Sequence, residues 1–297
     1  MYDVTKVNGG FIENFNQYLS TSVSRTRDCL GVNHKTFRNM LGMTLTRYTD
    51  VVLKKDEFSI QELQNLADTL DFDIDLLFKG KIDYVALAKQ FRGDRTVFPE
   101  RYADESQQFG RARTGTVIFS HLAAYHGESY AREYFRRFQL YPEAFAEPSA
   151  FVNPVIHFDL VGGMTKEGYS EEQIRSIGTM TFALSPPELH RKLAWLKAPK
   201  TLYSYVYEEL LRTQFDRMFD YQLTGFTDTG CKTVVRPRQE AQDAFKRKIV
   251  DNRQSCLYRQ GVASSFLANI SPHFAEIHEE SCVHHGDKLC AYEINWN

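Results

Sequence analysis

The stretch SCVHHGDKLCAYEINW, Ser281–Trp296, decides the fold that we predict for the C-terminal half of the chain. It places Cys282 and Cys290 on either side of Gly286, a residue type that tolerates the positive φ angles of tight turns. A three-residue loop at 285–287 would make the two cysteines opposed partners on neighbouring strands, with Cβ atoms about 5 Å apart. The segment therefore predicts a β-hairpin whose two cysteines can share one ion.

Two further residues extend this pair into a metal site. Cys256 precedes a predicted helix whose apolar residues recur at i, i+4 and i+8 from Val262. Glu279 stands three residues before Cys282, which is the wrong parity for one strand face, so a bulge or bend must turn it inward. Three thiolates and one carboxylate complete a tetrahedral shell for zinc and leave no position for water. Cys256, Glu279, Cys282 and Cys290 therefore predict a structural zinc site that joins a helix start to a hairpin.

Other assignments of these residues stay open. Buried free cysteines are common, and Cys282 and Cys290 could instead form a disulfide. Three nearby histidines, His278, His284 and His285, could replace Glu279 as a ligand, although histidines in exposed turns usually contact solvent.

The order of these ligands resembles the 4-vinyl-reductase-like domain of bacterial small-molecule sensors, including the phenol-sensing activators related to the xylene regulator. In those sensors one Cys, one Glu and two Cys around a Gly-Asp turn bind a structural zinc, and a segment like Tyr-Glu-Ile follows, as at 292–294 here. The resemblance covers the C-terminal third of the chain well and the segment before it loosely. It implies an α/β ligand-binding domain and leaves the ligand open.

The composition sets broad limits. The chain has 297 residues, a formal net charge of −2, and 25% charged and 13% aromatic residues, which fits two ordinary soluble domains. No apolar run is long enough to cross a bilayer, and the first residues, MYDVTKVNGGFIENF, lack the basic-then-apolar pattern of a signal peptide. An odd number of cysteines without such a signal favours a reducing compartment. We therefore expect a cytoplasmic protein without a membrane partner.

Residues 23–55 form a basic segment within this nearly neutral chain. Only Asp28 and Asp50 stand there against seven basic residues, which are Arg25, Arg27, Lys35, Arg38, Arg47, Lys54 and Lys55. A local basic patch is typical of phosphate contact, and the alternative is a solvated helical face.

Residues 27–78 resemble the lambda-repressor-like (XRE-type) helix-turn-helix family without gaps. NHKTFRNML takes the place of the second helix, Gly42 that of the turn, and TLTRYTDVVLKK that of the recognition helix. Ser59–Phe78 then matches the fourth and fifth helices, with an N-cap at Ser59 and a short last helix entered through Asp73. The resemblance implies that the third helix enters the major groove of double-stranded DNA by its N-terminal turn.

That docking assigns roles to individual residues. The residues expected to reach base edges or sugars are Thr44, Thr46, Arg47 and Thr49, and those expected to contact phosphates are Lys35, Lys54 and Lys55. The chain departs from the family's pattern at His34, Arg38 and Val52. A second register, similar to a Fis-type recognition helix, would use His34, Lys35, Thr36 and Arg38 instead. A degenerate module that binds a protein also stays open.

The whole chain is predicted to be α+β, with an all-α helix-turn-helix domain followed by an α/β ligand-sensing domain with antiparallel hairpins. The first domain would span 1–84, a polar linker 85–108, and the sensing domain 109–297, with its zinc-bearing part at about 200–297. From Thr201 the pattern becomes strand-like, and RMFDYQLTGF and KTVVRPR alternate around TDTG as in a hairpin.

Three histidines are candidates for the wall of a ligand pocket: His121, His126 and His157. The histidines show no metal-ligand spacing, and no nucleophile elbow, phosphate loop or dinucleotide fingerprint occurs. We therefore expect a ligand-responsive transcription regulator, a homodimer that binds DNA and a small, mostly apolar effector, and no enzyme. The alternatives are an adaptor whose N-terminal helices bind a protein, and an enzyme for a small aromatic or tetrapyrrole-like substrate.

Overall fold

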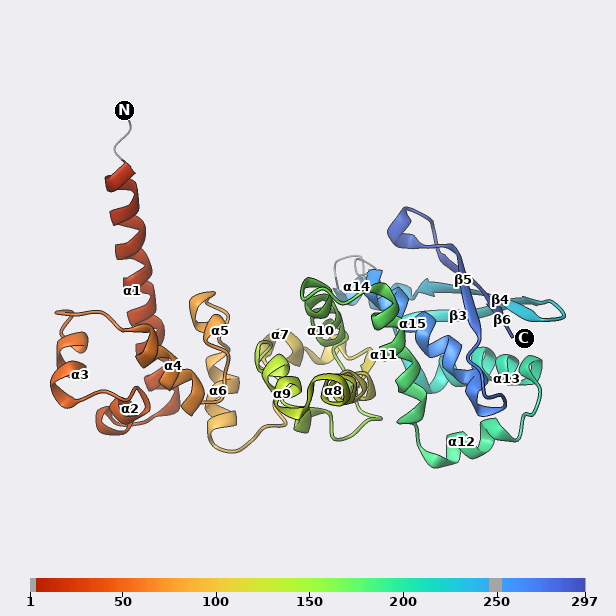
Figure 1. Cartoon of the computed structure of the whole chain (residues 1–297), viewed down its shortest axis with the longest axis horizontal. Helices are drawn as coiled ribbons and strands as arrows, with labels where there is room; N and C mark the ends of the chain where they lie inside the picture. The colour runs from red at the N-terminus through yellow and green to blue at the C-terminus, as the bar shows by residue number, and fades with distance from the viewer. Residues whose placement is uncertain (1–3, 246–252, 297) are drawn as a thin grey trace. The chain divides into compact units, whose positions relative to one another are not determined.

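The computed structural model describes residues 4–245 and 253–296, with side chains at 15–211, 215–245 and 253–296. The protein is α+β and divides into two compact units, residues 1–101 with 132–144 and residues 102–131 with 145–297 (Figure 1). This division differs from the predicted boundaries at 84 and 108. The segment predicted as a linker contains helices α6 (Tyr84–Phe91) and α7 (Glu100–Ala103), because Ala86, Leu87 and Ala88 give it a buried face.

The first unit is built from helices. They are α1 (Val4–Leu30), α2 (His34–Met40), α3 (Leu45–Val52), α4 (Ile60–Thr69), α5 (Ile74–Phe78) and α6, and a part of α9 (Glu128–Arg136) also belongs to this unit. Their shared core contains Leu19, Leu41 and Leu66.

Several predicted turns and caps of this unit are confirmed. Ser59 caps α4 in a capping box with Glu62, Asp73 caps α5, and Gly42 has a φ of 69° in the turn between α2 and α3. Each of these residues satisfies backbone groups that a helix end leaves unpaired, or adopts a backbone angle that a side chain disfavours. These local signals explain why the helix order of 34–78 could be predicted.

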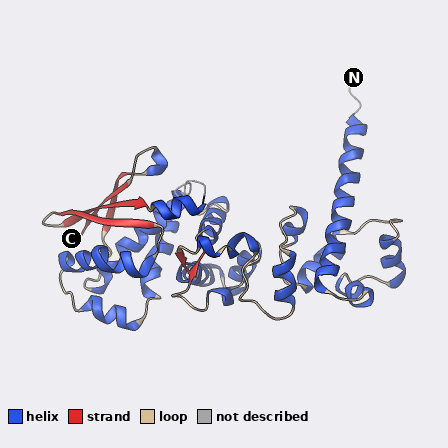
Figure 2. Ribbon diagram, turned by 180° about the vertical axis from the view of Figure 1, so that it is seen from behind, coloured by secondary structure: helices blue, strands red, loops and turns tan. Residues whose placement is uncertain are grey.

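The second unit combines helices with two antiparallel sheets (Figure 2). Its helical elements are α8 (Ala112–His126), α10 (Val155–Lys166), α11 (Glu171–Ala183), α12 (Pro187–Ala194), α13 (Pro199–Tyr205), the π-helical segment Val206–Phe215, α14 (Gln239–Phe245) and α15 (Arg253–Ser265). Short strands β1 (Gly110–Arg111) and β2 (Phe151–Val152) pair with each other, and the larger sheet has the order β3-β4-β6-β5.

The strands of the larger sheet are β3 (Phe219–Phe226), β4 (Gly230–Pro237), β5 (Glu276–Ser281) and β6 (Cys290–Asn295). The predicted hairpin around TDTG is confirmed, but the predicted start of strand structure at Thr201 is wrong, because residues 199–215 are helical. Alternate residues of β6 are buried, namely Cys290, Tyr292 and Ile294, so one face of the sheet packs on the helices.

The C-terminal hairpin differs in one respect from the prediction. Strands β5 and β6 pair with a bulge between Glu279 and Ser281, as expected from the parity of Glu279. The predicted three-residue loop is wrong, because the strands stop at Ser281 and resume at Cys290. A 3₁₀ turn and a hydrogen bond from Cys282 N to Asp287 Oδ2 (2.8 Å) close the longer loop instead.

Helices α11 and α15 approach each other closely at two glycines. A Cβ atom on Gly178 would lie 2.1 Å from the Tyr258 carbonyl oxygen, and one on Gly261 would lie 1.9 Å from the Arg175 carbonyl oxygen. Such distances are far below van der Waals contact, so a side chain at either position must push the two backbones apart. The glycines therefore set the position of α15 against α11.

Among the described residues, no helix combines the length and the apolar character needed to cross a bilayer.

We expect Gly261→Ala to destabilise the second unit by about 2–3 kcal/mol, because the added methyl group overpacks a rigid backbone contact. Chemical denaturation of the two variants and the parent protein measures this change. Gly225→Ala is the matched control, since its Cβ would meet nothing within 4 Å. Equal stability of Gly261→Ala and Gly225→Ala would contradict the close packing.

Candidate metal centre and ligand cavity

Three cysteine sulfurs meet inside the second unit. Cys256 lies within α15, rather than before a helix as predicted, while Cys282 follows β5 and Cys290 opens β6. The Sγ–Sγ distances are 3.8 Å for Cys256–Cys282, 3.9 Å for Cys256–Cys290 and 4.0 Å for Cys282–Cys290. All three side chains are buried. The sulfurs thus form a nearly equilateral triangle that joins one helix to both strands of the hairpin.

The size of this triangle fits a metal better than a disulfide. Thiolates at about 2.3 Å from a tetrahedral zinc ion lie about 3.8 Å from one another, which matches the three distances. A disulfide would require sulfurs about 2.05 Å apart, and all five cysteines are free. Cys256, Cys282 and Cys290 are therefore the residues that could hold a metal ion, and the distances suit zinc.

Two partly buried arginines lie beside the sulfurs and compensate negative charge on them. Arg259 Nη2 donates to Cys256 Sγ (3.3 Å), and Arg253 Nη1 donates to Cys282 Sγ (3.4 Å). Hydrogen bonds from the thiols of Cys282 and Cys290 lower the pKa of Cys256, and the charge of Arg259 lowers it further. The same thiol contacts raise the pKa of Cys282 and Cys290. The cluster favours at least one thiolate, which is the form that binds metal.

The fourth predicted ligand is placed differently. The carboxylate of Glu279 accepts hydrogen bonds from Arg253 (2.5 and 2.7 Å) and from Gln260, and it lies outside the group formed by the three sulfurs. His284 also acts on the cluster, since its side chain lowers the pKa of the Cys256 thiol. Nε2 of His284 is buried without a partner among the described residues. The side chain of His285 is exposed, which fits the expectation for a histidine at a surface turn.

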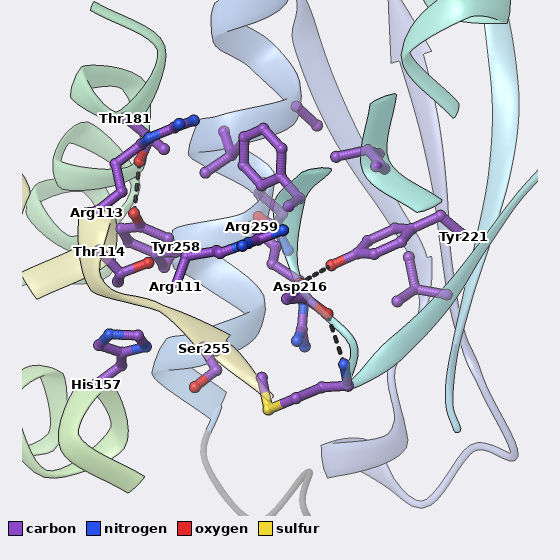
Figure 3. A pocket seen from close by; sticks show the side chains of 18 of the residues that line it. Arg111, Arg113, Thr114, His157, Thr181, Asp216, Tyr221, Ser255, Tyr258 and Arg259 are labelled. Carbon is purple, nitrogen blue, oxygen red and sulfur yellow. Dashed lines mark hydrogen bonds between the residues drawn. The ribbon is translucent and has the colours of Figure 1, made fainter. Parts of the chain in front are cut away.

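A cavity of about 90 Å³ lies beside α15 within the same unit (Figure 3). Its apolar wall includes Phe158, Val161, Leu211, Phe215 and Phe266. Its polar wall comes from several elements and includes Arg111, Arg113, Thr114, His157, Thr181, Asp216, Tyr221, Ser255, Tyr258, Arg259 and Gln260. A mostly apolar cavity with a few converging polar groups is typical of a small-molecule site.

The carboxylate of Asp216 and the hydroxyl of Tyr258, which both line this cavity, have hydrogen-bond partners within the protein. Asp216 accepts hydrogen bonds from the Tyr221 hydroxyl (2.6 Å) and from two backbone amides, of Met218 and Phe219. The Tyr258 hydroxyl lies 2.5 Å from that of Thr181. Burial raises the pKa of Asp216, and the hydrogen bonds partly offset this effect.

The three predicted pocket histidines occupy different surroundings. His157 lines the cavity, and burial lowers its pKa to about 3, so the ring is neutral. His121 is buried beside Tyr125, and His126 is exposed and lies 2.6 Å from the Tyr169 hydroxyl. Neither of these two lines the cavity.

The residues predicted to contact DNA lie on and around α2 and α3. Lys35, Thr46, Lys54 and Lys55 are exposed. Thr44 caps α3 by accepting a hydrogen bond from the Arg47 backbone amide, and it is exposed as well. Thr49 donates its hydroxyl hydrogen to the Leu45 carbonyl one turn earlier in the same helix.

The side chain of Arg47 is held by ion pairs and a hydrogen bond within the first unit. Its guanidinium pairs with Glu62 (2.8 Å) and Asp56 and donates to the Glu57 carbonyl. A side chain with three internal partners supports the α3–α4 connection, so its contribution to any base contact is limited. His34 and Val52 are two positions at which the sequence departs from the helix-turn-helix family pattern. His34 Nδ1 lies 2.7 Å from the Tyr48 hydroxyl, and the side chain of Val52 is exposed.

Sequence reasoning missed the arginines of the cavity. Arg111 and Arg113 flank the start of α8, and the only local signal is their occurrence just before an apolar run. Arg259 and Gln260 follow Cys256 by one helical turn, which could have placed them near the metal cluster.

No protein-family model and no curated protein matches this chain. Among solved structures, a mutant of an H-NOX protein from K. algicida in the Fe(II) unliganded form aligns with a TM-score of 0.46 and 13% identity. The alignment covers 63% of this chain and 96% of that protein. A similarity of this degree supports no argument about the fold or the activity of this chain.

We expect Cys256→Ser to lose bound zinc and to destabilise the second unit by about 3 kcal/mol or more, because metal binding is coupled to folding. Elemental analysis and thermal unfolding measure the two effects. Cys231→Ala is the control, since Cys231 is a buried cysteine outside the cluster. Equal zinc content in both variants would refute the metal centre. Comparing His284→Gln with Glu279→Gln then identifies the fourth ligand as the residue whose loss weakens zinc binding.

We expect His157 to make the stability of the protein depend on pH. The unfolded histidine binds a proton below about pH 6.5, whereas the folded one stays neutral down to about pH 3. The contribution of the neutral His157 to the free energy of unfolding is therefore largest above pH 6.5. This contribution falls as the pH decreases through that value. Between pH 6 and pH 5 the parent protein should lose about 1 kcal/mol more than His157→Gln. Parallel loss in both proteins, measured by urea denaturation, would contradict a neutral buried His157.

Proposed function

We propose that the second unit is a receptor for a small, mostly apolar effector, and that the chain is a ligand-responsive transcription regulator without catalytic activity. In this proposal the first unit is the DNA-binding module and a structural zinc ion stabilises the receptor. The observation that carries it is the cavity to whose wall α15, the helix that also supplies Cys256, contributes several residues.

The position of α15 explains how an effector could alter the protein. Arg259 and Gln260 both line the cavity. Arg259 also donates a hydrogen bond to Cys256 of the metal cluster, and Gln260 donates one to Glu279. An effector that displaces either side chain must break or re-form one of these hydrogen bonds. Binding energy in the cavity is thereby coupled to the order of the C-terminal hairpin.

The arrangement of α2, a glycine turn and α3 supports the DNA-binding role. The exposed lysines Lys35, Lys54 and Lys55 are suited to phosphates, and the exposed Thr46 is suited to a base edge or sugar. Proteins that bind DNA in this way read two half-sites as dimers, so we also propose a homodimer.

A second function is favoured by one observation on α3. Leu45, Val52 and Leu53 are 66%, 49% and 57% exposed, so apolar side chains occupy part of the surface of this helix and its C-terminal end. Exposed apolar residues that lie together are typical of protein contacts. The alternative proposal is an adaptor whose N-terminal helices bind a protein partner.

The salt dependence of duplex binding separates these two functions. We expect the affinity for a selected DNA duplex to fall steeply with salt concentration, with a slope of about −0.9 for each neutralised phosphate. The triple variant Lys35→Ala, Lys54→Ala, Lys55→Ala should reduce the magnitude of that slope by roughly 2–3 without changing the melting temperature. Fluorescence anisotropy at several salt concentrations provides the measurement.

The control for this experiment is Lys89→Ala, an exposed lysine on α6 of the same unit. Arg47 is left unchanged because its ion pairs with Glu62 and Asp56 make its loss a change in stability. Failure to select any duplex from a random pool, or binding without salt dependence, would reject the DNA-binding role and favour the adaptor.

A further inference from the structure

The cavity of the second unit holds more positive charge than its own residues neutralise. Three arginines line it, Arg111, Arg113 and Arg259, whereas Asp216 is the one carboxylate in its wall among the described residues. Arg259 donates a hydrogen bond to the sulfur of Cys256. Asp216 accepts hydrogen bonds from the Tyr221 hydroxyl and from two backbone amides. These contacts do not neutralise the charges of Arg111 and Arg113.

Neither arginine forms an ion pair or a hydrogen bond with a carboxylate within residues 4–245 and 253–296, although Asp216 lies near enough to Arg111 to act on its charge. Arg111 donates to the Ser149 carbonyl and lies 3.6 Å above the Phe151 ring. Arg113 reaches only the Ser185 hydroxyl, at 3.4 Å. In both side chains Nε is buried without a hydrogen-bond partner. A buried donor without an acceptor costs about 1–3 kcal/mol, and more when the donor is charged.

The electrostatic surroundings of Arg111 and Arg113 also disfavour their positive charges. Burial lowers the pKa of Arg111, repulsion from Arg217 and Arg113 lowers it further, and attraction by Asp216 offsets only part of this effect. Burial likewise lowers the pKa of Arg113. A lowered pKa means that the site disfavours the guanidinium charge as it stands. An anion beside the two side chains would reverse that effect.

Two more features belong to the wall of the same cavity. His157 Nε2 is buried and has no hydrogen-bond partner among the described residues, and its ring packs against Gly110, next to Arg111 in the chain. Arg113 and Thr114 belong to the first turn of α8, which has no side-chain cap. The positive end of the helix dipole adds to the preference for negative charge.

The rest of the wall is apolar and aromatic. Phe158 and Val161 come from α10, Phe215 ends the π-helical segment, and Phe266 follows α15. A ligand that satisfies the whole cavity therefore has an anionic head and an apolar body.

We propose that the effector is a small organic carboxylate, whose head is bound by Arg111, Arg113 and His157 and whose body lies among the aromatic side chains. This inference rests on the proposed receptor function and names its ligand class. A planar carboxylate matches the fork of an arginine guanidinium, which can donate two parallel hydrogen bonds. The neutral His157 ring adds one hydrogen bond without adding charge.

The test uses pairs of probes that differ only in charge: benzoate and benzamide, phenylacetate and phenylacetamide, octanoate and octanamide. Calorimetric titration of the full chain should show at least one acid binding about tenfold or more tightly than its amide, because a charge-assisted hydrogen bond is lost in the amide. Arg113→Gln should remove this preference and leave the affinity for the amide nearly unchanged. Arg191→Gln, at an arginine of α12 whose side chain is 72% exposed, is the control and should keep it.

A second measurement needs no ligand. If Arg113 is an unpaired charge kept for binding, Arg113→Met should raise the melting temperature of the ligand-free protein, whereas a structural arginine would lower it when replaced. A lowered melting temperature together with equal binding of acids and amides would overturn the carboxylate proposal and leave the receptor function standing. Binding of no probe, together with native mass spectrometry that finds no small molecule retained by the purified protein, would reject both.

Discussion

Helix α15 is held on two sides by contacts that allow almost no change of distance. On one side, Gly261 brings its backbone against α11, where even a methyl group would collide with a carbonyl oxygen. On the other side, Cys256 completes a triangle of sulfurs with the two cysteines of the β5–β6 hairpin. A helix fixed in this way is a rigid wall for the adjoining cavity. Its side chains can then be aimed with precision, which a small-molecule site requires.

The electrostatics of the second unit follow from this arrangement. Burial opposes the charge of Arg259, but the Cys256 thiolate and neighbouring Tyr221 and Tyr292 raise its pKa, so this arginine is balanced inside the protein. Arg253 is balanced in the same way by Glu279 and Cys282. For Arg111 and Arg113 at the start of α8, the attraction of Asp216 and Tyr258 does not offset burial, and the pKa of each stays lowered. The contrast separates charges that are balanced inside the protein from charges that, in our proposal, await a ligand.

The first unit shows why a run of basic residues is weak support for nucleic-acid binding. Four arginines of the basic segment are engaged internally: Arg25 stacks on Tyr84, Arg27 pairs with Asp28, Arg38 donates to Asn39, and Arg47 bridges to Glu62. The lysines remain exposed, and they carry the electrostatic case for phosphate contact. Apolar residues on α3 compete with that case, so the surface chemistry of this helix allows two kinds of partner.

The sequence by itself determined the features that depend on neighbouring residues. The caps at Ser59 and Asp73, the glycine turn before α3 and the bulge near Glu279 each follow from local backbone chemistry, and the cysteine spacing was enough to group the three sulfurs. Only the tertiary structure decided which charges are neutralised. Glu279 meets Arg253 and Gln260, and the arginines at the start of α8 meet a cavity formed by residues far along the chain. Such pairings depend on how helices and sheet pack, and periodicity within one segment carries no information about them.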